Sequence, residues 1–239
     1  MSSIQSGHAF YGQHIAVLVF STTTPRLAGD AGNNSSFDFP VRYEIIEGGF
    51  SDLIKGSDII RQRLVSAARN LAELGIRGIV GDCGLMSLYQ KEIAQEGIPF
   101  VGSSLCLIPS VWQMVGRKGN IGILTGHSEL LSKKHLIASG WDETINISIQ
   151  GMENEPHFNN IVIQGGHELD PVQMRNDVLN GVDKLMTKTD DLSAIIIECS
   201  NLGTFSSSVY EKTRVPVLDV ISCSILLERM INPHVFSER

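Results

Sequence analysis

Two cysteines of this 239-residue chain lie in matching sequence contexts and could exchange protons with a small organic acid. Cys83 and Cys199 each follow a short apolar run that ends in an acidic residue, within GIVGDCG and AIIIECSN respectively. A proline opens a second apolar run 16 positions after Cys83 and 17 positions after Cys199. Repeated structural units leave such fixed-offset traces, so the pattern predicts a duplicated half-domain. Two related halves could present both thiols to one cleft.

The strand-end position of the two cysteines predicts reactive thiols. Backbone N–H groups are free where a parallel strand turns towards a helix, and they favour negative charge. They would lower the pKa of both thiols and could also bind a substrate carboxylate. If the thiols flank an α-carbon, one thiolate removes its proton and the other thiol protonates the opposite face, which inverts the configuration without a cofactor. If only one thiol acts, β-elimination, decarboxylation with protonation or covalent addition becomes possible.

The longest irregular stretch, Ser21 to Pro40, follows the predicted first strand, at the sheet edge where open α/β folds bind ligands. We interpret it as a substrate loop or lid, the alternative being a mobile surface connection. Arg26 could bind a carboxylate with two guanidinium nitrogens. Three neighbouring hydroxyls could also donate hydrogen bonds to that carboxylate: Thr22, Thr23 and Thr24.

Other titratable residues are secondary candidates. His127 follows a predicted strand and is the best candidate for an auxiliary proton shuttle, ahead of His167. Asp82 and Glu198 need not face the neighbouring thiols, because successive side chains of a strand point to opposite sides. We expect these two acids to bond to nearby loop amides.

The remaining two cysteines, Cys106 and Cys223, lie in apolar helical segments. Free cysteine often behaves as a small buried hydrophobe, so we expect both in the core. The four cysteines show no C-x-x-C spacing, and we expect no metal site.

Short β-branched runs alternate with longer amphipathic segments, which predicts an α/β fold. We expect two pseudo-symmetric halves, residues 1–118 and 119–239, each a mainly parallel sheet flanked by helices, with the active site in the cleft between them. The last helix could pack on the first half. Helical periodicity is clearest over 57–74 and 171–187. Strands are also expected at 14–20, 41–46, 78–82, 99–102, 120–125, 145–150 and 161–164, and shorter helices at 88–95, 105–115 and 129–139.

The composition argues against a nucleic-acid-binding, membrane-spanning or secreted protein. The net charge of −7 lacks the basic footprint of a nucleic-acid binder. No apolar run reaches the roughly 18 residues of a membrane helix, and the polar start lacks the features of a secretory signal. We therefore expect a cytoplasmic protein with reduced thiols and with neither nucleic acid nor membrane as a partner.

The paired blocks GDCG and IECSN, the loop PRLAGDAGN and the segment GILTGHSELLSKKHL together resemble the aspartate/glutamate/hydantoin racemase superfamily over nearly the whole chain. The resemblance implies a cofactor-independent enzyme with one acid–base cysteine from each half, here Cys83 and Cys199. Members are frequently dimers, and we expect a homodimer. Positions that would hold the substrate, mainly its carboxylate, are Gly84, Leu85, Ser200, Asn201, Thr22 and Thr23.

The expected activity is racemisation or epimerisation of a small carboxylate, an amino acid or a hydantoin-like compound. Amino-acid racemases of the superfamily often carry C-N-T or C-T at the cysteines, whereas here C-G-L follows at Cys83 and C-S-N at Cys199. The superfamily also includes maleate isomerases, arylmalonate decarboxylases and algal-type lyases of dimethylsulfoniopropionate. A lyase, a cis–trans isomerase or a decarboxylase is therefore the alternative, together with a non-catalytic protein that binds small acids.

Overall fold

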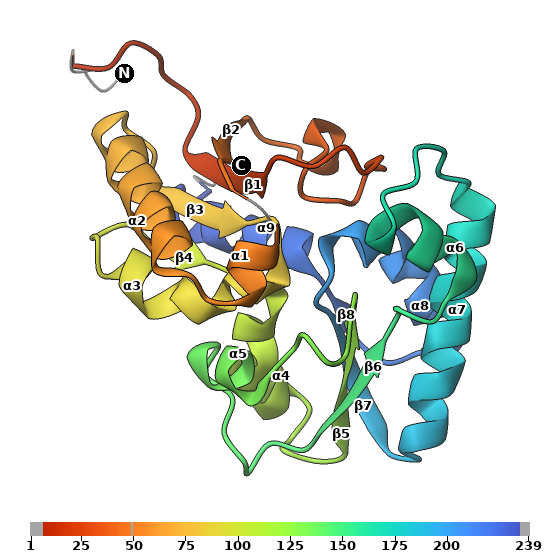
Figure 1. The fold of residues 1–239 in the computed structure, drawn as a ribbon. Coiled ribbons are helices and arrows are strands. Elements are labelled where there is room, and N and C mark those ends of the chain that lie inside the picture. Colours follow the sequence, from red (N-terminus) through yellow and green to blue (C-terminus); the bar gives the residue numbers. More distant parts are fainter. Residues whose placement is uncertain (1–6, 49, 235–239) are drawn as a thin grey trace, which may run out of the picture.

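A computed structural model describes residues 7–48 and 50–234, with two four-stranded parallel sheets at its centre (Figure 1). The first sheet has the order β2-β1-β3-β4, and the second has the matching order β6-β5-β7-β8. The first sheet contains β1 (Ile15–Phe20), β2 (Val41–Ile46), β3 (Gly78–Gly81) and β4 (Phe100–Val101). The second contains β5 (Asn120–Thr125), β6 (Ile147–Gly151), β7 (Leu192–Ile197) and β8 (Val217–Leu218). The repeated order confirms the predicted α/β fold with two pseudo-symmetric halves.

Helices cover these sheets, so the central strands are apolar along their length. In β1, the side chains from Ile15 to Leu18 are fully buried, as are those from Ala194 to Ile196 in β7. The α-helices are α1 (Phe50–Ile54), α2 (Asp58–Glu73), α3 (Gln90–Ala94), α4 (Ile108–Met114), α5 (Lys133–Ala138), α6 (Pro156–Phe158), α7 (Pro171–Lys188), α8 (Ser206–Thr213) and α9 (Val220–Ile231). Within the described ranges, none of these helices has the length and apolar character needed to cross a membrane.

The two longest helices form where the periodicity predicts them, at α2 and α7. Ser57 caps α2 by accepting a hydrogen bond from the Ile60 N–H, and Asp170 caps α7 in the same way. Pro171 occupies the first turn of α7, where its missing N–H is harmless. One face of α2 is buried against the first sheet through Ile60, Leu64, Ala67, Ala68 and Leu71.

The prediction for residues 161–164 is wrong, because this segment is helical. A π-helix, Asn159–Ile163, continues directly from α6. Phe158 and Ile161 are both fully buried at a spacing of three residues. A run of three apolar residues, Ile161 to Ile163, fits a strand and a helical turn equally well, so the sequence does not decide between them.

Several shorter helices differ from their predicted bounds. The segment 88–95 begins earlier, as a 3-10 helix over Gly84–Tyr89, before α3. The segment 105–115 likewise begins as a 3-10 helix, Ser104–Leu107, before α4. The helix expected at 129–139 forms only as α5, where Ser132 and His135 make a reciprocal cap.

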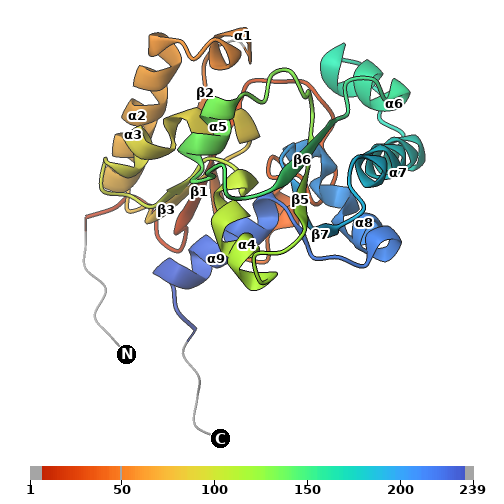
Figure 2. The ribbon, with the colours of Figure 1, turned by 90° about the horizontal axis from the view of Figure 1, so that it is seen from below.

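The two halves share one packed body. Figure 2 shows α2 and α3 at one end of the molecule and α6, α7 and α8 at the other, with α9 between them. Although it is the last helix of the described chain, α9 packs on β3 and β4 of the first sheet. Leu227 of α9 lies so close to Gly78 that a Cβ added there would be 3.0 Å from its side chain. Helix α5, from the second half, packs on the 3-10 helix after Cys83.

Candidate active site

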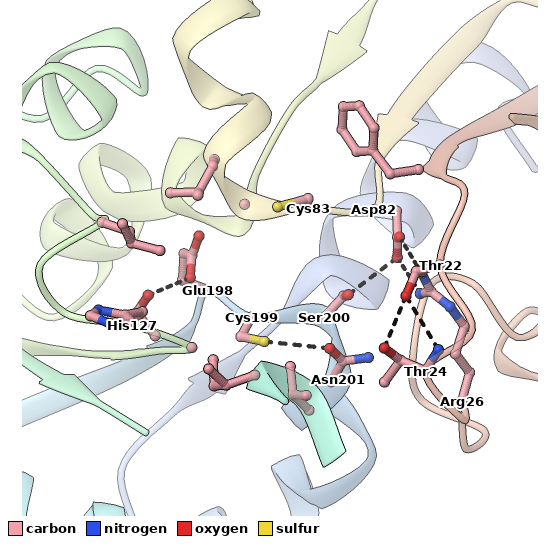
Figure 3. Close-up of a pocket in the computed structure, with 18 of the residues that line it drawn as sticks. Thr22, Thr24, Arg26, Asp82, Cys83, His127, Glu198, Cys199, Ser200 and Asn201 are labelled. Carbon is pink, nitrogen blue, oxygen red and sulfur yellow. Dashed lines mark hydrogen bonds and ion pairs between the residues drawn. The ribbon is translucent and has the colours of Figure 1, made fainter. Parts of the chain in front are cut away.

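Cys83 and Cys199 line the same cavity, which has a volume of about 310 Å³ (Figure 3). Each cysteine lies two residues beyond its strand, β3 or β7, and begins a 3-10 helix, Gly84–Tyr89 or Ser200–Phe205. The two residues also meet through an isolated antiparallel backbone bridge. Figure 3 shows their sulfur atoms on opposite sides of the open space, which is the arrangement that two-thiol proton transfer needs.

Most of the candidate residues lie on the wall of this cavity. The structure brings together the following predicted residues there: Thr22, Thr24, Arg26, Gly84, Leu85, His127, Ser200 and Asn201. Thr23 is exposed and does not line it. The apolar part of the wall consists of Phe20, Leu85, Leu130, Val162 and Ile163. The last two belong to the π-helix, and the strand that the sequence predicts for this segment gives no indication that they line the cavity.

The environment of the thiols differs from the expectation. Burial raises the pKa of the Cys83 and Cys199 thiols, and the nearby Glu198 carboxylate raises it further. The backbone N–H groups of Leu85 and Asn201 do favour the thiolates, as predicted. These N–H groups do not outweigh burial and the charge of Glu198, so the predicted lowering of the thiol pKa is wrong.

Arg26 lies at the cavity wall, bonded to two acids. Its guanidinium donates two hydrogen bonds of 2.7 Å to the Asp82 carboxylate and one of 2.7 Å to Asp30. Burial alone would lower the pKa of Arg26, but the contacts with the two aspartates raise it. Burial raises the pKa of Asp82, and the hydrogen bonds from Arg26 oppose that rise. Both terminal nitrogens of the Arg26 guanidinium already donate to protein carboxylates. A substrate carboxylate would therefore have to compete with Asp82 and Asp30 for them.

Asp30 continues the network into the second half. It accepts a hydrogen bond of 2.6 Å from Asn201 Nδ2, which turns Oδ1 of that amide towards Cys199. The Cys199 thiol donates to Asn201 Oδ1 over 3.8 Å. The spacing of Arg26 and Asp30 does not reveal this network, because charges four residues apart are neighbours on a helix and these two residues lie in a loop.

The predicted substrate loop is divided between two roles. Its first residues, including Thr22 and Thr24, are hydrogen-bonded to each other at 2.9 Å beside the cavity. Its middle is fixed against the second half, where a Cβ at Gly29 would lie 2.7 Å from the Thr204 nitrogen. The loop therefore connects the halves next to the thiols, and whether it also closes as a lid stays a prediction.

Glu198 and Thr125 form a second polar cluster in the cavity wall. Thr125 Oγ1 donates a hydrogen bond of 2.7 Å to Glu198 Oε2, and the Gly126 N–H also bonds to this carboxyl. Burial raises the pKa of Glu198. The bond to Gly126 agrees with the expectation of a loop-amide partner, but the position of Glu198 inside the cavity was not foreseen.

Of the two histidine candidates, only His127 lies at the cavity. Its Nδ1 is buried and has no hydrogen-bond partner among the residues that the structure describes. His167 is exposed in the loop before α7 and does not line the cavity. An auxiliary role for His127 stays a prediction.

Comparison with known proteins identifies a family for this chain. It is 30% identical over 205 residues to a dimethylsulfoniopropionate lyase of Durusdinium sp. clade D, and the match covers 82% of this chain and 67% of that protein. The chain belongs to the dimethylsulfoniopropionate lyase family. It is also 28% identical over 225 residues to dimethylsulfoniopropionate lyase 6 of Emiliania huxleyi, which covers 87% of this chain. No family model matches the chain.

This member of the dimethylsulfoniopropionate lyase family corresponds to part of each relative. It spans 67% of the Durusdinium protein and 58% of the Emiliania protein. The relatives are named as enzymes, and their names place them among lyases and not isomerases.

Solved structures with the same fold include a decarboxylase and racemases. Unliganded arylmalonate decarboxylase matches with a TM-score of 0.60 and 14% identity, over 93% of this chain and 94% of that one. Allantoin racemase from Klebsiella pneumoniae matches with a TM-score of 0.52 and 17% identity, over 92% and 87% of the two chains. This likeness confirms, at the level of the fold, the resemblance of the lyase-family chain to the racemase superfamily.

Proposed function

We propose that this protein is a cofactor-independent lyase that eliminates a leaving group from the β-carbon of a small carboxylate. Dimethylsulfoniopropionate, the compound in the names of its relatives, is the candidate substrate. The observation that carries the proposal is the meeting of Cys83 and Cys199 on one cavity in a chain of this family.

The elimination needs a base and a site for the carboxylate. A thiolate, from Cys83 or Cys199, removes a proton from the carbon next to the carboxylate. The electron pair forms the carbon–carbon double bond while the bond to sulfur breaks, and the products are dimethyl sulfide, acrylate and one proton. The N–H groups of Leu85 and Asn201 lie at the starts of two 3-10 helices, where they can stabilise the charge that develops on the carboxylate.

The charge and the lining of the cavity suit a zwitterion with a sulfonium group. The cavity wall includes the acids Asp82 and Glu198, whereas Arg26 supplies one positive charge. An apolar wall, described above, can contact the methyl groups of a sulfonium, and Phe20 offers an aromatic ring of the kind that attracts organic cations.

Incubation of the purified protein with dimethylsulfoniopropionate tests this proposal. We expect acrylate and dimethyl sulfide in equal amounts, and we expect Cys83→Ser or Cys199→Ser to reduce kcat/KM by about 100-fold or more for the cysteine that acts as the base. Cys106→Ala serves as the matched control, because Cys106 lies outside the cavity. Full turnover in both serine variants would exclude thiol chemistry, and failure to form acrylate would exclude this substrate.

Racemisation is the second candidate function, and one observation favours it. The two thiols come from equivalent positions of pseudo-symmetric halves and face one space, which matches the need for an acid and a base on opposite faces of an α-carbon. Incubation of candidate acids in deuterium oxide separates the functions. A racemase introduces deuterium at the α-carbon of recovered substrate, whereas a lyase yields an unsaturated acid and a binding protein does neither.

A further inference from the structure

Each of the two acids that precede the cysteines contacts a residue of the other half. Asp82, from the first half, accepts a hydrogen bond of 3.2 Å from Ser200 in the second half and is ion-paired with Arg26. Glu198, from the second half, reaches across to Gly84 in the first half. Asp82 is the counterpart of Glu198, and Gly84 is the counterpart of Ser200, so the crossing is reciprocal. The two acids nevertheless end in different electrostatic environments.

Glu198 lacks the cation that Asp82 has. Its hydrogen-bond donors are the Thr125 hydroxyl and the Gly126 N–H, both of them neutral. In the described part of the chain, no salt bridge reaches Glu198. Its side chain is buried, and the residue as a whole is 5% exposed. A buried carboxyl without a cation takes up a proton more readily than one that is paired with a guanidinium.

Glu198 shares the cavity with both thiols. Figure 3 shows its carboxyl group at one side of the open space, at a level between Cys83 and Cys199. Like charges in a buried site repel each other, so an ionised Glu198 opposes a thiolate at either position. After burial, Glu198 is the largest cause of the raised pKa of both thiols. The three groups therefore compete to carry negative charge.

We propose that Glu198 is a third acid–base group of the cleft, which takes up the proton that a thiol loses when the thiolate forms and releases it to solvent after turnover. This inference rests on the proposed function of the thiols. Before the reaction, Glu198 is a carboxylate and both thiols are neutral. Transfer of one proton gives a carboxylic acid and a thiolate, and the total charge is unchanged. The thiolate then accepts the α-proton of the substrate, and Glu198 loses its proton, which accounts for the proton that elimination releases.

The other charged groups of the cleft also act on the pKa of the thiols, but the variants that test Glu198 leave them unchanged. Asp82 and Arg26 lie on the other side of the cavity in Figure 3, and Asp30 is bonded to Arg26. His127 lies on the same side as Glu198. All four groups stay in place in the variants below, so a change in pH dependence between variants reports on Glu198.

Glu198→Gln tests the inference because it removes the charge and the exchangeable proton with little change in shape. We expect the pH midpoint for iodoacetamide alkylation of Cys83 and Cys199, followed by peptide mass spectrometry, to fall by about one unit or more. We also expect kcat/KM at neutral pH to fall by about 10-fold or more, and its acidic limb to move to higher pH. Glu153→Gln is the matched control, since Glu153 bonds to Ser128 and is not a main cause of the raised pKa of either thiol.

Unchanged alkylation midpoints for both cysteines, or an unchanged acidic limb, would overturn the inference. If the glutamine variant does not fold, Thr125→Val and Thr125→Ser give the same decision with Glu198 in place. Loss of the hydroxyl should raise the pKa of Glu198 and move the acidic limb upward, whereas serine should preserve the wild-type profile. Identical profiles for valine and serine would also overturn it. Alkylation needs no substrate, so the inference is testable even if dimethylsulfoniopropionate is not cleaved.

Discussion

Gly84 lies directly against the carboxyl group of Glu198. A Cβ built on Gly84 would be 2.7 Å from Glu198 Cγ and closer still to the carboxyl carbon and Oε1. The residue after Cys83 must therefore lack a side chain if Glu198 is to occupy the cavity wall. The equivalent residue of the second half, Ser200, does carry a side chain, and its hydroxyl donates a hydrogen bond to Asp82.

We predict that Gly84→Ala destabilises the protein by about 1 to 3 kcal/mol, because the added methyl group overlaps a buried side chain. Chemical denaturation of the variant measures this loss. Glu198→Asp shortens the side chain that causes the overlap, so the double variant should lose less stability than the sum of the single variants. Additive losses would show that the close contact between the two residues does not limit packing.

Cys223→Ala is predicted to lower the free energy of unfolding by about 1 kcal/mol and to leave activity unchanged. Cys223 is 1% exposed and packs on the inner side of α9. Cys106→Ala should behave similarly, although Cys106 is only half-buried and its thiol donates to Gln90 over 3.3 Å. Thermal unfolding and turnover of both variants check this, and a loss of activity comparable to that of the Cys83 and Cys199 variants would contradict it.

The repeated blocks around Cys83 and Cys199 were sufficient to predict two matching sheets. Apolar runs that end in an acid and a cysteine mark β3 and β7. Both cysteines follow the carboxyl ends of these equivalent inner strands. That local pattern survives in the sequence because each half must build the same strand and turn.

The partners of Asp82 and Glu198 could not be predicted in the same way. Alternation along a strand indicates only that an acid and its neighbouring cysteine point to different sides. Which residue of the other half each acid meets depends on how the two sheets pack together. The raised thiol pKa is missed for the same reason, since burial and the charge of Glu198 are properties of the assembled cleft.

Asn201→Asp is predicted to raise the pKa of the Cys199 thiol above its wild-type value. Asn201 Oδ1 lies 3.8 Å from the Cys199 sulfur, so the substitution brings a negative charge next to this thiol. Alkylation of Cys199 should require a higher pH, whereas alkylation of Cys83 should change less and provides an internal control. An equal shift at both cysteines would indicate a general disturbance of the cleft and not a local charge effect.

Arg26→Met is predicted to destabilise the protein by about 3 to 5 kcal/mol at neutral pH, because Asp82 and Asp30 lose their shared cation in a buried site. Without Arg26 the pKa of Asp82 rises further above its unfolded value. A carboxyl with a raised pKa binds a proton on folding, so the stability of the variant is greatest in acid and is lost as pH rises through the folded pKa.

The difference in unfolding free energy between wild type and Arg26→Met should therefore shrink between about pH 7 and pH 4. Urea denaturation at both pH values measures it. Arg69→Met is a suitable control, since Arg69 pairs with Glu96 at the surface and its loss should cause little change. A difference that is the same at both pH values would mean that the penalty comes from lost packing of the Arg26 side chain and not from unpaired carboxylates.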